Sequence, residues 1–68
     1  MTRVIFRQEG TSWKFVCEQE GSDETALDKA QRSFNDGDRL LVVCTDIVCP
    51  SAKEYTVGKT LTFTEVVV

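Results

Sequence analysis

The stretch SDETALDKAQRSFN, residues 22–35, decides the fold because it carries the periodicity of an amphipathic helix. Ser22 is a favoured N-cap residue, and Asp23 and Glu24 suit the positive end of a helix dipole. Gly37 follows, and its conformational freedom suits a left-handed turn that ends the helix. A helix over about 22–35 is therefore predicted to lie across a sheet. Its apolar stripe consists of Ala26, Leu27, Ala30 and Phe34.

Two strands are predicted on the N-terminal side of this helix. Residues 3–7 and 12–18 alternate between the two faces with a period of two, and residues 9–11 supply a turn that contains a glycine. This arrangement is typical of an antiparallel hairpin. In the first strand Val4 and Phe6 alternate with Arg3, Ile5 and Arg7. In the second, Trp13, Phe15 and Cys17 are expected on one face, with Lys14, Val16 and Glu18 on the other.

The C-terminal side predicts the remaining strands. Residues 39–48 are apolar on both faces over their first half, which is typical of a central strand. Pro50 interrupts this strand, and residues 54–57 and 60–65 suggest a second hairpin around a turn at Gly58. The predicted fold is α+β and forms a single domain, residues 1–68. One helix packs on one face of a four- to five-stranded, mainly antiparallel sheet in the order β-β-α-β-β-β.

The composition argues against catalysis and against bound cofactors. The chain has no histidine, which is the commonest general base and transition-metal ligand. Gly58-Lys59-Thr60 resembles the end of a phosphate-binding loop, but position 53 is a lysine where that motif needs a glycine. A structural zinc site needs about four ligands, and this chain has only three thiols. We therefore expect no enzymatic activity, no cofactor and no metal.

The cysteines and the N-terminus predict a cytoplasmic protein. Cys17, Cys44 and Cys49 cannot all pair within one chain, so reduced thiols are expected. Cys17 and Cys44 are expected to be buried, whereas Cys49 beside Pro50 is expected to be exposed, and a redox role for Cys49 is one alternative function. The N-terminal residues carry too many charges for a signal peptide, and no apolar run approaches the length needed to span a membrane.

The charge is unevenly distributed along the chain. Between Glu18 and Asp38 seven acidic residues oppose two basic ones, for a local charge of −5, whereas the remaining residues sum to +2. This acidic module is either a solvated helix face or a surface that docks a basic partner or mimics a phosphate backbone. Trp13 is either a core aromatic or an interface anchor. The candidate partner-binding residues are Asp23, Glu24, Asp28, Asp36, Asp38 and Trp13.

These features together favour a binding function. Small size, acidity and the lack of a cofactor motif match by analogy the accessory proteins of phages and mobile elements, which include anti-CRISPR inhibitors of host defence. We predict a non-enzymatic protein that binds and modulates or inhibits a macromolecular target. The expected partner is a protein with a basic surface, without direct contact to nucleic acid or membrane.

The C-terminal residues support an alternative function. The chain ends in three valines, Val66 to Val68, with no charged residue after Glu65 to protect a strand edge. The strand Thr60–Val68 either lies within the sheet or pairs with a second chain. In the second case the protein is a homodimer or an assembly subunit.

Overall fold

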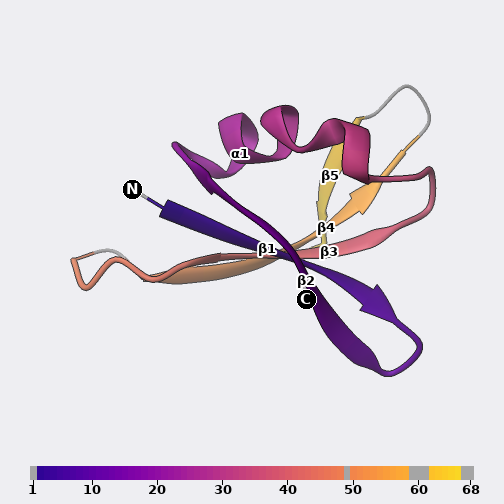
Figure 1. Cartoon of the computed structure of the whole chain (residues 1–68), viewed down its shortest axis with the longest axis horizontal. Coiled ribbons are helices and arrows are strands. Elements are labelled where there is room, and N and C mark those ends of the chain that lie inside the picture. Colours follow the sequence, from indigo (N-terminus) through magenta and orange to yellow (C-terminus); the bar gives the residue numbers. More distant parts are fainter. Residues whose placement is uncertain (1, 49, 59–61, 67–68) are drawn as a thin grey trace.

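Five strands and one α-helix follow one another in the order that the sequence predicts. The structure is a computed structural model that describes residues 2–48, 50–58 and 62–66. The helix packs on one face of the antiparallel sheet, so the predicted α+β class is confirmed (Figure 1). The elements are β1 (Thr2–Glu9), β2 (Ser12–Glu20), α1 (Asp23–Lys29), the 3-10 turn η1 (Gln31–Ser33), β3 (Arg39–Cys44), β4 (Ser51–Val57) and β5 (Phe63–Val66).

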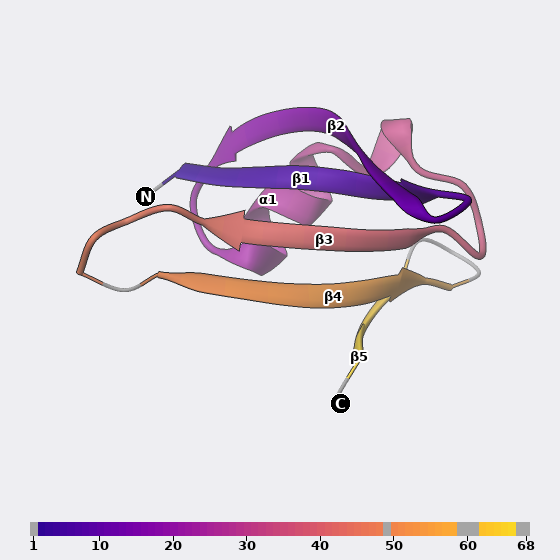
Figure 2. The ribbon, with the colours of Figure 1, turned by 90° about the horizontal axis from the view of Figure 1, so that it is seen from below.

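The strands lie in the spatial order β2-β1-β3-β4-β5, and every neighbouring pair is antiparallel. β3 is the central strand, as its two apolar faces predict. The order itself differs from the order along the chain, because β1 lies between β2 and the much later β3 (Figure 2). β5 lies at one edge of the sheet and β2 at the other.

The helix begins where predicted and ends early. The Ser22 hydroxyl accepts a 3.3 Å hydrogen bond from the Thr25 amide and so caps α1. The α-helix stops at Lys29, and η1 continues the chain as a tighter turn, so the predicted helix over 22–35 is too long. Gly37 has a φ of +89° and donates a 2.8 Å hydrogen bond to the Val57 carbonyl in the turn before β3, rather than capping α1. Within the described residues no helix has the length and apolar character needed to cross a membrane.

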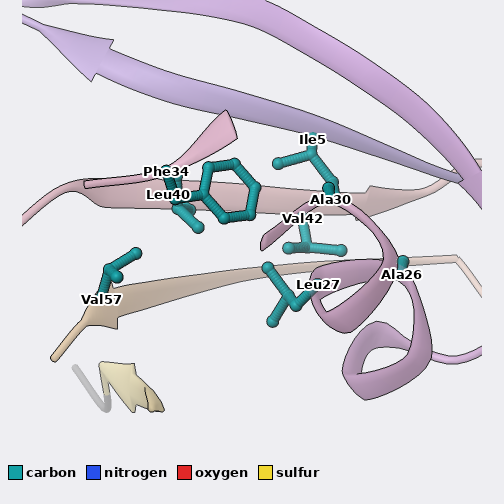
Figure 3. Close-up of a cluster of buried hydrophobic side chains, with 8 residues drawn as sticks. All are labelled: Ile5, Ala26, Leu27, Ala30, Phe34, Leu40, Val42 and Val57. Atoms are coloured by element: carbon teal, nitrogen blue, oxygen red, sulfur yellow. The ribbon is translucent and has the colours of Figure 1, made fainter. Parts of the chain in front are cut away.

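The hydrophobic core lies between α1 and the face of the sheet that α1 covers (Figure 3). The predicted helical stripe is confirmed, since all four of its members are buried. They meet side chains that alternate along β1, β3 and β4 at the helix-facing positions. The core cluster consists of Ile5, Ala26, Leu27, Ala30, Phe34, Leu40, Val42 and Val57.

A β-bulge in β2 overturns the predicted alternation of that strand. The register between β1 and β2 shifts so that Val16 is an extra residue between Cys17 and Phe15. Val16 and Cys17 both pack against the core, whereas Phe15 lies on the opposite face and is 62% exposed. Trp13 lies two residues before Phe15 on β2 and therefore on the same face, and it is not part of the core cluster. An extra residue breaks the period of two, so Phe15 and Cys17 cannot share a face.

The remaining boundaries also differ from the predicted ones. β3 ends at Cys44 rather than Val48, because the Asp46 carboxylate accepts a 2.8 Å hydrogen bond from the Val48 amide and replaces ladder pairing with a local turn. β4 begins earlier than expected, directly after Pro50. Cys49 and the predicted turn and strand residues 59–61 and 67–68 lie outside the described residues.

Candidate functional site

Asp23, the first residue of α1, is held by two strands of the sheet. Its Oδ1 atom accepts a 2.6 Å hydrogen bond from Arg3 Nε on β1, and its Oδ2 atom accepts one of 2.8 Å from the Tyr55 hydroxyl on β4. The side chains of Arg3 and Asp23 are only 14% and 15% exposed. The carboxylate therefore fixes the start of α1 above the sheet, and both of its oxygens have partners within the chain.

The environment of Tyr55 favours its neutral form. Burial raises the pKa of the phenol above its ordinary value, and the hydrogen bond to the Asp23 carboxylate raises the pKa further. The hydroxyl consequently remains a donor at neutral pH. Arg3 extends the same cluster, because its Nη1 atom lies 3.2 Å from the sulfur of buried Cys44.

A groove adjoins this cluster between α1 and the β4–β5 pair. Two hollows, of about 480 and 350 Å³, share Glu24 and Phe63 and so form one continuous surface. Glu24 also lines a third hollow of about 470 Å³ beside Asp23 and Lys53. We call the first two hollows the acidic groove, and they are lined by Glu24, Thr25, Asp28, Tyr55, Phe63 and Glu65.

The helix side of the acidic groove carries two carboxylates that have no counterion among the described residues. Glu24 and Asp28 are four residues apart and therefore share one face of α1. Both are exposed, and within the described part of the chain neither forms an ion pair. Lys29 does not neutralise them, because its Nζ atom donates to the Glu20 carbonyl at 3.2 Å. Two like charges at this spacing destabilise a helix by a few tenths of a kcal/mol.

Aromatic side chains and a third acid complete the groove. The ring of Phe63 packs edge-on against Phe34, with ring centroids 6.0 Å apart, and is half-buried. Glu65 lies two residues further along β5 and pairs with Lys53 at 3.6 Å. Carboxylates beside an aromatic ring suit a cationic side chain, which gains from both kinds of contact.

The other predicted partner-binding residues lie elsewhere. Asp36 is exposed in the turn before β3. Asp38 is half-buried in the same turn, where its Oδ2 atom accepts a 2.8 Å hydrogen bond from the Asn35 amide. Trp13 is placed on the sheet face opposite α1. Of the predicted set, the structure therefore brings only Glu24 and Asp28 together in the acidic groove.

Four groove residues were missed by reasoning from the sequence, namely Thr25, Tyr55, Phe63 and Glu65. Phe63 and Glu65 are two residues apart on one strand, so the alternation of residues 60–65 already places them on a common face. That pattern could not show that this face meets α1, since β5 and α1 are far apart along the chain. The expectation about buried thiols holds for Cys44, whereas Cys17 is only half-buried.

No protein-family model matches this sequence, and no curated protein or solved structure is significantly similar to it. Among the described residues, no three histidine, cysteine or carboxylate side chains are grouped so that they could hold a metal ion.

Proposed function

We propose that this chain is a non-enzymatic binding protein that takes a basic segment of a macromolecular partner into the acidic groove. One observation carries the proposal. Among the described residues Glu24 and Asp28 have no counterion, and they line the groove from one face of α1 together with the Phe63 ring. A lysine or arginine of the partner supplies the missing positive charge and lays its side chain against that ring.

The energetics favour occupation of the groove by a cation. In the free protein the two carboxylates repel one another across one turn of helix. A guanidinium or ammonium group between them removes this repulsion and forms charge-assisted hydrogen bonds, which are stronger than neutral ones. Binding of a basic segment therefore removes an electrostatic repulsion that is present in the folded, unbound protein.

The proposal also covers the lack of catalysis, a cytoplasmic location and the inhibition of a target. The absence of histidine from the sequence supports a role without catalysis, and three cysteines suit a reducing cytoplasm. Inhibition of a target such as a host-defence protein is compatible with a small acidic binder. Mimicry of a nucleic-acid backbone needs a row of free acids, and Asp23 is already bound by Arg3 and Tyr55. Docking of a basic protein segment is therefore the simpler form of the proposal.

Charge reversal in the groove tests this function. In the double variant Glu24→Lys/Asp28→Lys both unpaired carboxylates are replaced, and Asp23 is left untouched because it holds the fold together. We expect the native protein to capture one dominant basic protein from a bacterial lysate, and to bind a lysine- and arginine-rich peptide in a fluorescence titration. The double variant should lose both interactions.

A matched control separates the groove from the general acidity of the chain. Asp36→Lys reverses the charge of an exposed acid outside the groove. It is compared with Asp28→Lys, which reverses a single charge inside the groove. Asp28→Lys should weaken peptide binding much more than Asp36→Lys. Equal effects of the two substitutions, or peptide binding that survives in the double variant, would show that the acidic groove is not the binding site.

Assembly through the C-terminal strand is a second proposal. β5 lies at the edge of the sheet, and within the described residues no strand pairs with its outer side. Such an edge can accept a strand from another chain. In this function the protein is an assembly subunit, and its self-association is strong while its affinity for basic peptides is negligible.

A further inference from the structure

The outer edge of β5 presents backbone groups that no strand of the described residues occupies. β5 has β4 on one side only (Figure 2). In an antiparallel pair, alternate residues direct their amide and carbonyl toward the partner strand, and the residues between direct theirs away. The Gly58 amide donates a 2.7 Å hydrogen bond to the Thr62 carbonyl, so the even-numbered residues of β5 direct their backbone groups toward β4. Those of Phe63 and Glu65 therefore point outward.

The pairing on the other side of β4 confirms this assignment. The Val57 amide donates to the Asp38 carbonyl at 2.9 Å, and the Val57 carbonyl accepts from the Gly37 amide at 2.8 Å. Val57 thus directs both groups away from β5, although it lies opposite Phe63. In such a pair the opposed residue also turns its groups away, so the amide and carbonyl of Phe63 face the open edge.

We infer, on the basis of the proposed function, that the basic segment in the acidic groove is an extended strand that pairs antiparallel with the outer edge of β5. Every neighbouring pair in this sheet is antiparallel, and antiparallel pairing is the more stable kind per residue. In recognition by strand addition, main-chain hydrogen bonds give affinity, and side chains at alternate positions give specificity.

A strand added at β5 delivers alternate side chains of the partner to the acidic groove. Phe63 lies opposite the buried Val57, and Glu65 lies opposite Tyr55, which binds Asp23. Both side chains of β5 are therefore on the side of the sheet that carries α1. Directly opposed residues of an antiparallel pair share a face, so partner residues opposite Phe63 and Glu65 also face α1. The partner residues between them face the other side of the sheet.

The charges at these two positions favour basic residues in the partner. The hollow beside Phe63 is also lined by Glu24 and Asp28, and the hollow beside Glu65 shares Glu24. A lysine carries its charge at the end of a long, flexible stem. A lysine opposite Phe63 can therefore place its ammonium group near Glu24 and Asp28, and one opposite Glu65 can place it near that carboxylate.

The basic residues of the chain itself leave this site negative. Four acids and two basic residues line the acidic groove and the adjoining third hollow, for a sum of −2, namely Asp23, Glu24, Asp28, Glu65, Arg3 and Lys53. Each of the two basic side chains pairs with an acid, Arg3 with Asp23 and Lys53 with Glu65. Arg32 lies in η1, four residues after Asp28, and no ion pair joins these two described side chains. The two charges left over are those of Glu24 and Asp28.

A second copy of this chain fits the open edge less well than a basic partner does. The edge strands of the sheet are β2 and β5. The only charged residue of β5 is Glu65, and β2 carries Lys14 together with Glu18 and Glu20. Either strand would bring more carboxylates to an acidic site, and neither has two basic residues at alternate positions. The basic partner therefore competes with assembly through β5.

Backbone-methylated peptides test the strand pairing separately from the charge. The probe is a fluorescently labelled peptide in which lysine and threonine alternate, and its binding to the full chain is measured by anisotropy. With the lysines opposite Phe63 and Glu65, the lysine amides donate to β5, whereas the threonine amides point to solvent. N-methylation of the lysine amides should weaken binding at least about tenfold. N-methylation of the threonine amides is the matched control and should change the affinity less than about threefold.

Two substitutions of Glu65 test the edge from the side of the protein. Glu65→Pro removes both the carboxylate and an outward-pointing amide of β5, whereas Glu65→Gln removes only the charge. Proline is tolerated on an edge strand where its nitrogen faces solvent, so the ladder to β4 is kept. Glu65→Pro should weaken binding of the alternating peptide about fivefold more than Glu65→Gln. The comparison of methylated peptides needs only the native protein, so it decides the inference even where Glu65→Pro does not fold.

The outcomes separate the strand pairing from the proposed function. Equal affinity of the two methylated peptides would overturn the strand pairing. If both peptides still lose affinity for Glu24→Lys/Asp28→Lys, the acidic groove remains the binding site and only the strand pairing fails. A native protein that binds none of the peptides would overturn both. Self-association that Glu65→Pro abolishes, in a protein that binds no peptide, would assign the open edge to a second copy instead.

Discussion

The hydroxyl of Tyr55 donates a 2.8 Å hydrogen bond to Asp23, whose other carboxylate oxygen accepts one of 2.6 Å from Arg3. One side chain at the start of α1 thereby joins two strands that are not neighbours, because β3 lies between β1 and β4. The acidic groove and the cluster around Asp23 adjoin each other at Glu24 and Tyr55. The position of the groove on the sheet therefore depends on this contact.

Removal of the Asp23 charge should destabilise the fold. Asp23→Asn removes the carboxylate charge that pairs with the largely buried Arg3 side chain, which should lower the free energy of unfolding by about 2 kcal/mol. Urea denaturation measures the change. Asp28→Asn is the control, because Asp28 is exposed and forms no ion pair with the described residues, and its effect should stay within about 0.5 kcal/mol. Equal stability of the two variants would contradict a structural role for Asp23.

Tyr55 should make stability depend on pH in the alkaline range. Its pKa is raised in the folded chain, so the folded state holds its proton more tightly than the unfolded state. Its contribution is fully present below about pH 10, the ordinary tyrosine pKa, and is lost as the pH rises above that value. Tyr55 is the only tyrosine, so tyrosinate absorbance reports its titration directly. We expect ionisation well above the ordinary pKa in native protein, a return to that value in denaturant, and a shallower alkaline loss of stability in Tyr55→Phe.

The two faces of the sheet should respond differently to truncation. Leu27 is 1% exposed in the core, and Leu27→Ala should lower the free energy of unfolding by about 3 kcal/mol through a cavity and lost burial. Phe15→Ala removes a larger side chain from a mostly exposed position. At low protein concentration it should cost less than about 1 kcal/mol. A larger loss from Phe15→Ala than from Leu27→Ala would mean that the sheet face opposite α1, which carries Phe15, is part of the core of the monomer.

Binding at the acidic groove should weaken with salt. An increase in ionic strength from about 0.1 M to 1 M shortens the Debye length from about 10 Å to 3 Å. Because Glu24 and Asp28 are exposed, their attraction for a basic peptide is then screened. We expect about a tenfold loss of peptide affinity, measured by fluorescence anisotropy. A peptide affinity that does not change with salt would contradict an electrostatic role for Glu24 and Asp28.

The features that the sequence predicts correctly are those set by local pattern. The buried stripe of α1 follows from the spacing of Ala26, Leu27 and Ala30, and Ser22 is a recognisable cap. The central place of β3 follows from its two apolar faces. Each of these properties depends on residues within one element, so no knowledge of distant partners is needed.

The features that were missed depend on contacts between distant residues. Asp23 looks like a free acid in the first turn of a helix, but its partners are 20 and 32 residues away. The extra residue Val16 leaves no mark in the hydrophobic pattern, so regular alternation assigns Phe15 to the wrong face. The acidic groove exists only because β5 is folded next to α1, and this depends on the spatial order of the strands.

The place of β1 between β2 and β3 has a consequence for the rate of folding. The β1–β2 hairpin is a local structure, but the next pairing in the sheet joins Arg3 to Cys44. That pairing must close a loop that contains all of β2, α1 and η1, and loop closure of this length is slow compared with hairpin formation. During synthesis, one edge of β1 consequently stays unpaired until β3 has emerged. The nascent chain is therefore exposed to mispairing for longer than a protein whose strands pair in the order in which they are made.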